Sequence, residues 1–165
     1  MSKIGIFYGS TTGNTEQLAN DIAAKLGVAA EDVHNVGESS ADDVDGYDVL
    51  LLGSSSWGEG ELQDDWYDFL DNLKAKDLSG KKVGLFGCGD SGSNPDTFCG
   101  AVAALHDGLK DTGCTFIGAY APEGYDVTDS AVCQDGKFVG LAIDGADPDS
   151  TDARVAAWTE LIKNA

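Results

Sequence analysis

A glycine- and hydroxyl-rich turn near the N-terminus has the residue types of a phosphate-binding site. Residues 9–15, Gly-Ser-Thr-Thr-Gly-Asn-Thr, follow an apolar run that ends at Tyr8 and precede a segment with the spacing of an amphipathic helix. The first N–H groups of a helix have no partner within the helix and carry roughly half a positive charge, so they hold an anion without a cationic side chain. We therefore predict a phosphate seat at this turn.

The absence of lysine from this turn narrows the choice of ligand. Loops that bind and hydrolyse nucleoside triphosphates need Gly-Lys-Ser/Thr, whereas Gly13 is followed by Asn14. A single phosphate monoester fits the turn better. An ordinary Ser/Thr-rich turn with a helix N-cap is the alternative that this segment alone leaves open.

A second loop carries Trp57 at a place where the chain is expected to be exposed. An indole there offers a flat apolar face to a planar ligand, and the nearby Gly58 and Gly60 let backbone amides approach the edge of that ligand. A tryptophan at a protein interface is the alternative. Trp66, in contrast, is predicted to lie in the core, because it shares helical spacing with Phe69, Leu70 and Leu73.

A third loop, residues 87–92, formally matches Gly-x-Gly-x-x-Gly. We do not interpret it as a dinucleotide fingerprint, because it follows the fourth strand-like run and Pro95 delays the next helix. Instead, Gly89 would permit the close approach of a ligand, and Asp90 would accept a hydrogen bond from a ring N–H.

The three loops must be positioned by a regular alternation of strands and helices. Such an alternation predicts a parallel sheet with helices on both faces, and ligands bind such sheets at the carboxyl ends of the strands. Strands are predicted at residues 3–8, 32–36, 48–52, 82–86 and 115–120, with a weak helical turn at 39–47. Helices are predicted at residues 14–26, 64–73, 96–111 and 151–163, the last one capped by Ser150 or Thr151. Residues 121–137 break the pattern before a strand resumes at 138–142, so we predict an insertion in the fifth strand.

Composition narrows the class of protein and partner. The chain has 165 residues, the length of one domain, and a formal charge of −19 from ten basic and 29 acidic residues. Nucleic acid is therefore excluded as a partner, a basic protein partner is favoured, and a monomer is expected. Added solubility is the alternative explanation of the acidity. Acidic side chains crowd the second loop and the helix after it, namely Glu59, Glu61, Asp64, Asp65, Asp68 and Asp71.

The expected cellular setting is the cytoplasm, with no membrane association, because no signal-like or membrane-spanning apolar stretch stands at the start of the sequence. The four cysteines form no Cys-x-x-Cys pair and lie far from the histidines in the sequence, so neither zinc nor disulfides are predicted. His34 and His106 have no acidic or cysteine partner that the sequence identifies, and a structural role is expected for both.

Taken together, these features resemble the flavodoxin family over essentially the whole chain. The resemblance rests on residues 4–15, on the Trp57 loop with residues 60–63, on Gly87-x-Gly89-Asp90, and on residues 136–144. It implies an α/β three-layer sandwich with a five-stranded parallel sheet of order 2-1-3-4-5, and FMN bound where the strand order reverses. The insertion in strand five is similar to that of the long-chain branch. Residues 1–165 would form a single FMN-binding domain.

The resemblance also implies a cofactor site. The ribityl phosphate would be bound by Ser10, Thr11, Thr12, Gly13, Asn14 and Thr15. The other cofactor-binding residues that it implies come from the second and third loops: Ser55, Ser56, Trp57, Gly58, Glu59 and Gly60, and Cys88, Gly89, Asp90, Asn94, Thr97 and Cys99. Trp57 would stack on the ring, Gly58 and Glu59 would address N5, and Gly89 and Asp90 would meet the pyrimidine edge. Asn94 stands where the family usually has a tyrosine, so the second flavin face is either open or covered in another way.

The charges of the loops predict the redox behaviour. None of the three loops has Lys, Arg or His, while Glu59, Glu61 and Asp90 are acidic, so an anionic hydroquinone is disfavoured. A neutral semiquinone, protonated at N5, would donate to the Gly58 carbonyl after its peptide reorients. The predicted function is a low-potential one-electron transfer protein that shuttles between semiquinone and hydroquinone, without catalytic residues or a metal. Its partners would be basic-surfaced redox proteins: a flavodoxin/ferredoxin reductase and an electron-accepting enzyme.

Two other functions remain open from sequence. The first is an FMN-dependent NAD(P)H/quinone reductase of the same fold, which the open face near Asn94 would permit. The second is a phospho-acceptor signalling domain, but Gly53-Ser54 occupies the place where it needs an aspartate.

Overall fold

The fold is organised by one parallel sheet. The computed structural model describes residues 3–9, 13–55, 64–89, 91–92, 98–122, 124–125, 130–145 and 147–165. In its main sheet the strand order is β2-β1-β3-β4-β5, and β8 also pairs with β4. The predicted order is therefore confirmed. The strands of this sheet are β1 (Ile4–Gly9), β2 (Val33–Asn35), β3 (Val49–Ser55), β4 (Lys82–Gly89), β5 (Thr115–Ile117) and β8 (Leu141–Asp144).

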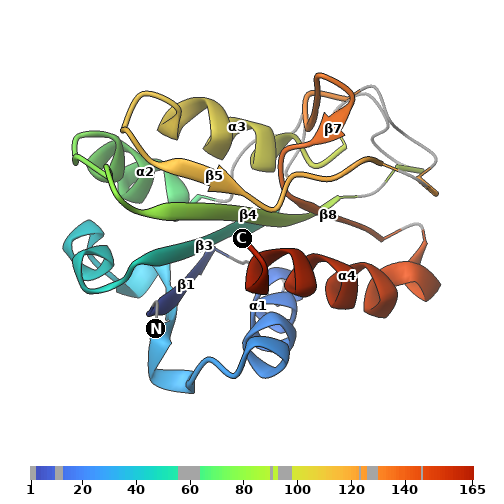
Figure 1. Ribbon diagram of the computed structural model, residues 1–165, viewed down its shortest axis with the longest axis horizontal. Helices are drawn as coiled ribbons and strands as arrows, with labels where there is room; N and C mark the ends of the chain where they lie inside the picture. Colours follow the sequence, from blue (N-terminus) through green and yellow to red (C-terminus); the bar gives the residue numbers. More distant parts are fainter. Residues whose placement is uncertain are drawn as a thin grey trace.

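Helices cover both faces of the sheet (Figure 1). The helices α1 (Asn14–Leu26) and α4 (Thr151–Lys163) lie on one face, and α2 (Trp66–Lys74) and α3 (Gly100–Leu109) lie on the other. The central strands are apolar because successive side chains enter different cores: Leu51 packs with the α1/α4 side, and Leu50 and Leu52 pack with the α2/α3 side. The three layers are thus held together by two apolar cores, one on each side of the sheet.

Strand five is split by an insertion, as the sequence predicts. The segment β5 pairs with Lys82–Gly84 of β4, and β8 pairs with Phe86–Gly89 of the same strand. The predicted boundaries need correction, because β5 ends at Ile117, and the resumed strand begins at Leu141 and continues to Asp144. Phe138 belongs instead to a hairpin inside the insertion, formed by β6 (Cys133–Gln134) and β7 (Lys137–Phe138).

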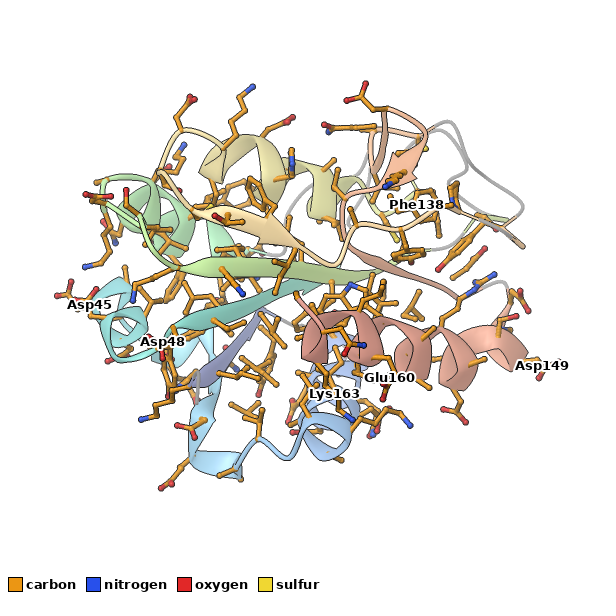
Figure 2. All side chains as sticks on the ribbon, in the orientation of Figure 1. Asp45, Asp48, Phe138, Asp149, Glu160 and Lys163 are labelled. Atoms are coloured by element: carbon orange, nitrogen blue, oxygen red, sulfur yellow. The ribbon has the colours of Figure 1, made fainter. Side chains whose placement is uncertain are left out.

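An aromatic cluster attaches the insertion to the domain. Phe138, labelled in Figure 2, is fully buried, and its ring centroid lies 4.6 Å from that of Tyr125. Tyr120 exchanges backbone hydrogen bonds with Phe138. The hydroxyl of Tyr120 accepts from the Ala142 N–H at 3.0 Å, and the hydroxyl of Tyr125 donates to the Ala142 carbonyl at 2.7 Å. The insertion therefore supplies hydrogen-bond partners to the middle of β8.

The remaining elements differ from the predictions only at their ends. The predicted turn at 39–47 is a short helix, η3 (Ala41–Gly46), closed by a capping box from Ser40 and Asp43. Within the described part of the predicted helix 96–111, α3 begins only at Gly100. Ser150 holds the N-cap position of α4, but its hydroxyl donates to the Asp147 carboxylate and does not cap the helix. The other short helices are η1 (Ala30–Asp32), η2 (Val36–Glu38) and η5 (Pro148–Ser150).

Candidate functional site

The carboxyl ends of the central strands lie side by side at one edge of the sheet. In the register of the sheet, Gly9 faces Ser54, Ser54 faces Gly87, and Gly89 faces Asp144. The strand order reverses between β1 and β3, where ligands bind in open parallel sheets. The three loops that the sequence singled out therefore begin next to one another at this edge.

Helix α1 begins in the geometry expected of an anion seat. Its N-cap is Gly13, which has a left-handed backbone with φ 91° and a carbonyl that accepts from the Gln17 N–H at 3.0 Å. Glycine adopts this conformation without the steric cost that a Cβ brings. The cap residue has no side chain that could accept a hydrogen bond from the first N–H groups of the helix. These groups form the positive end of the helix dipole, which is directed at the space before α1.

A buried hydroxyl in the first turn of α1 supports this assignment. Thr15 is fully buried, and its Oγ1 has no hydrogen-bond partner within the described part of the chain. Burial raises the pKa of the neighbouring Cys88 thiol to about 11, and the adjacent Thr15 side chain acts in the opposite direction. A buried hydroxyl without a hydrogen bond costs about 1–3 kcal/mol, and within the described residues nothing offsets that cost for Thr15. This agrees with the predicted anion seat.

The end of β4 is packed against the start of α3. A Cβ at Gly89 would lie 2.8 Å from the Cys99 backbone nitrogen and 3.1 Å from the Phe98 ring. In the structure the turn before α3 approaches the Gly89 backbone closely. The predicted approach of a ligand to Gly89 stays a prediction. Cys99 has a left-handed backbone with φ 52° and a fully buried thiol directed at the Ile143 carbonyl, 3.9 Å away. The Cys99 thiol therefore belongs to the core, and a contact of this residue with a cofactor stays a prediction.

Trp66 fixes the chain on one side of the second loop. It is fully buried, as predicted, and its Nε1–H donates to the Gly53 carbonyl at 2.6 Å. This bond joins the start of α2 to β3 just before the strand ends, so both anchors of the loop belong to the rigid core.

A small cavity lies beside these elements. Its volume is about 260 Å³, and it is bounded by the first turns of α1, the end of β4 and the connection from β8 to α4. Its lining residues are Gln17, Leu18, Asp21, Cys88, Gly89, Ile143, Gly145 and Thr151. The cavity shows that the carboxyl edge is not closed by side chains between α1 and α4.

Many of the predicted site residues lie outside the described residues. They are Ser10, Thr11, Thr12, Ser56, Trp57, Gly58, Glu59, Gly60, Asp90, Asn94 and Thr97, together with the side chains of Asn14 and Ser55. Of the predicted set, the structure brings together Gly13, Thr15, Cys88, Gly89 and Cys99, plus the backbones of Asn14 and Ser55, around the ends of β1, β3 and β4.

The acidic surface predicted beside the second loop is present in part. Asp64, Asp65, Asp68 and Asp71 are all exposed. The first three line a polar depression of about 440 Å³ between α2 and the η2–η3 segment. Glu59 and Glu61 lie outside the described residues.

The structure adds one residue that sequence reasoning missed. Asp144, the last residue of β8, is 2% exposed, and its carboxylate accepts from both the backbone N–H and the hydroxyl of Ser91. The only signal in the sequence was an acid that directly ends the last apolar strand and precedes Gly145.

The structure gives His34 a hydroxyl partner and places a carboxylate near His106, two contacts that the sequence did not identify. His34 Nε2 lies 2.7 Å from the Tyr47 hydroxyl, which donates to Asp32 at 2.9 Å. Burial, followed by the Asp32 hydrogen bond, raises the pKa of Tyr47 to about 12. His106 Nδ1 lies 3.8 Å from the Asp107 carboxylate. Both rings stack in the fold, on Phe7 and Phe116 respectively, which agrees with structural roles.

Within the described part of the chain, no group of three or more His, Cys, Asp or Glu side chains is arranged to hold a metal ion. In the same residues, no helix has the length and apolar character needed to cross a bilayer.

Comparison with known proteins shows which family the chain resembles. The family model described as Flavodoxin matches residues 6–158. Flavodoxin 1 of Salmonella typhimurium is 43% identical over 98% of this chain and 93% of its own length. The flavodoxin of Trichodesmium erythraeum is also 43% identical, over 99% of this chain and 97% of its own.

A solved structure agrees with the sequence relatives. The crystal structure of Fusobacterium nucleatum flavodoxin bound to flavin mononucleotide superposes with a TM-score of 0.89 at 30% identity, over 99% of this chain and 98% of that one. The split fifth strand is consistent with the long-chain type. With this fold, this strand order and these relatives, the chain belongs to the flavodoxin family.

Proposed function

We propose that this chain is an electron carrier that transfers one electron at a time through a bound FMN. The observation that carries the proposal is the start of α1, where a left-handed Gly13 and the buried, unpartnered hydroxyl of Thr15 prepare an anion seat without lysine. This seat lies where the strand order reverses, which is where open parallel sheets bind their ligands. A relative whose crystal structure contains flavin mononucleotide has the same fold. FMN supplies the one-electron chemistry, and the protein supplies binding, orientation and electrostatics.

The residues present fit this cofactor. In the described part of the chain, Gly13 and Thr15 would hold the phosphate together with the first N–H groups of α1. The segment at the end of β4 would meet the ring, and the anchored loop after β3 would cover it. The roles of the predicted residues outside the described part remain part of the proposal.

The proposed working potential is low. A negative charge on the reduced ring is disfavoured where no cationic side chain faces it, and the three loops have no Lys, Arg or His. The chain as a whole carries a formal charge of −19. Each added electron must therefore enter a negative environment, which makes the reduced protein a strong donor.

The proposed partners are redox proteins with basic surfaces: a reductase that loads the carrier and an enzyme that accepts its electrons. Asp64, Asp65, Asp68 and Asp71 are exposed on and just before α2, beside the loop proposed to cover the flavin. Opposite charges steer such encounters and orient the docked pair.

Three further properties belong to the proposal. Residues 1–165 form one FMN-binding domain, which the match of the family model over residues 6–158 supports. The protein works as a monomer, because its high net charge opposes self-association. It works in the cytoplasm, since all four cysteines are free thiols, as is usual in a reducing compartment.

Reduction of the FMN-loaded protein under anaerobic conditions tests this function. We expect reduction in two separate one-electron steps with a chemical reductant, and negligible oxidation of NAD(P)H unless a flavodoxin or ferredoxin reductase is added. Steady NAD(P)H oxidation by the isolated protein, with or without a quinone, would contradict the carrier function and support a reductase of the same fold.

A further inference from the structure

The carboxylate of Asp144 is buried at the edge of the sheet. It is 2% exposed, and of the described Asp and Glu residues it alone is buried. Burying a carboxylate costs several kcal/mol unless hydrogen bonds compensate for the lost water. Asp144 accepts from the Ser91 N–H at 3.0 Å and from the Ser91 hydroxyl at 2.5 Å, so one residue supplies two charge-assisted bonds.

These bonds fasten the chain just beyond β4. On the other side of Asp90, Gly89 is also held, because it pairs with Asp144 in the sheet and its carbonyl accepts from the Gly145 N–H at 2.7 Å. Both chain neighbours of Asp90, Gly89 and Ser91, are therefore fixed to the end of β8.

The support behind Asp144 is itself rigid. The strand β8 pairs with β4 along its length, and the hydroxyls of Tyr120 and Tyr125 bond to the backbone of Ala142 two residues before Asp144. Displacing the backbone that carries this carboxylate would require breaking the sheet pairing or the aromatic cluster of the insertion. A group held in this way can define the position of whatever it binds.

We propose that Asp144 is a positioning residue for the flavin ring: through Ser91 it sets the place of the backbone that meets the pyrimidine edge. The proposal rests on the proposed function, since it assigns a role within the same FMN site. Asp144 would act on ring binding and leave the phosphate seat at Gly13 and Thr15 unchanged, because that seat belongs to α1.

Three variants separate this role from a purely structural one. Ser91→Ala removes the hydroxyl bond and keeps the charge, and Asp144→Ala removes both bonds. Asp144→Asn is the conservative variant, because its amide oxygen accepts from the Ser91 N–H and its NH₂ donates to the Ser91 hydroxyl. Ser150→Ala is the matched control, since it removes a serine-to-aspartate hydrogen bond, to Asp147, on the α4 side of the same turn.

The experiment titrates each folded apoprotein with FMN, riboflavin and inorganic phosphate, and follows flavin fluorescence or heat. We expect Ser91→Ala to weaken the binding of both flavins about tenfold, which is the loss of one charge-assisted hydrogen bond, and Asp144→Ala, which loses two, to weaken it at least as much. Inorganic phosphate should bind as before. A double variant with Ser91→Ala and Asp144→Ala should bind flavin no more weakly than Asp144→Ala alone, and Asp144→Asn should keep most of the affinity of the unaltered protein. Ser150→Ala should match the unaltered protein.

A second readout reports the charge. The carboxylate disfavours negative charge on a reduced ring, so Asp144→Asn should raise the reduction potential for the second electron. The rise is about 59 mV for each tenfold gain in affinity for the fully reduced flavin relative to the one-electron-reduced flavin. Ser91→Ala keeps the charge and should change this potential less.

The outcomes distinguish the two proposals. If all variants bind riboflavin like the unaltered protein and their potentials are unchanged, Asp144 is structural only and the inference is overturned, even if stability falls. If Asp144→Asn does not fold, flavin affinity in Ser91→Ala decides alone. If the unaltered chain binds no FMN, the proposed function fails, and this inference fails with it.

Discussion

The indole N–H of Trp66 donates a 2.6 Å hydrogen bond to the backbone carbonyl of Gly53, which joins the first residue of α2 to β3 two residues before the strand ends. The loop between these anchors carries Trp57. The bond therefore couples the stability of the core to the placement of the loop that is proposed to cover the flavin.

Replacing Trp66 with Phe tests this coupling. The variant removes the donor and keeps most of the buried ring, so apoprotein stability should fall by about 1–3 kcal/mol, and FMN affinity should fall as well. Trp158→Phe is the matched control, because its Nε1–H donates to the Gly118 carbonyl at 3.0 Å, away from this loop. Urea unfolding and FMN titration of both variants give the comparison. An equal effect of both variants on FMN affinity would remove the proposed link between Trp66 and the loop.

The phosphate seat is tested by Thr15→Val, which deletes the buried hydroxyl without changing the shape of the side chain. We expect FMN affinity to fall by about 1–3 kcal/mol, while riboflavin, which lacks the phosphate, binds as before. Apoprotein stability should stay the same or rise, because Oγ1 has no partner within the described residues. Thr159→Val, whose hydroxyl donates within α4, serves as the control. Unchanged FMN affinity, measured by calorimetry, would remove Thr15 from the seat.

We predict that the apoprotein loses stability at alkaline pH because of the Cys88 thiol. Burial raises its pKa from the ordinary 9.0 to about 11, so the folded protein keeps a proton that the unfolded chain releases. The stabilisation is complete below pH 9 and is lost as the pH rises toward 11, at about 1.4 kcal/mol per pH unit. In Cys88→Ser apoprotein, the fall of the unfolding free energy between these pH values should be less steep by that amount. Identical slopes in urea titrations at pH 9, 10 and 11 would refute the assignment.

Most of the architecture could be predicted from the sequence because it follows from local patterns. Short apolar runs such as residues 49–52 are typical of buried parallel strands, and the spacing of Leu18 and Ile22 defines one face of α1. The split of strand five was visible because residues 121–137 lack periodicity. The point where the insertion ends was not visible in the sequence. Phe138 is as apolar as a strand residue, but contacts with Tyr120 and Tyr125, which are distant in the sequence, bury it.

The candidate site was predictable where glycines and hydroxyls occur at a strand-to-helix junction, as at Gly13 and Thr15. It was not predictable where a residue acts through a tertiary contact. Ser91 and Asp144 are 53 residues apart, and only the pairing of β8 with β4 brings them together. The packing of Cys99 on Gly89 likewise depends on how α3 approaches the sheet.

The acidic surface at α2 should govern partner docking. We expect electron transfer from a basic reductase to slow with increasing salt, and Asp68→Lys to slow it roughly tenfold at low ionic strength. Glu31→Lys is the control, because it makes the same charge change in η1. This short helix precedes β2 and so lies at the amino ends of the strands, opposite to the candidate site. Stopped-flow reduction at several ionic strengths measures both effects. A rate that does not depend on salt, or equal slowing in both variants, would indicate apolar docking elsewhere.

Titration of the unaltered apoprotein with FMN shows whether the chain binds this cofactor. We expect saturable quenching of flavin fluorescence with one FMN per chain, and weaker binding of riboflavin because the seat at α1 is then unfilled. Fluorescence that remains equal to that of free FMN when the apoprotein is in excess would contradict the claim that this sheet edge holds the cofactor.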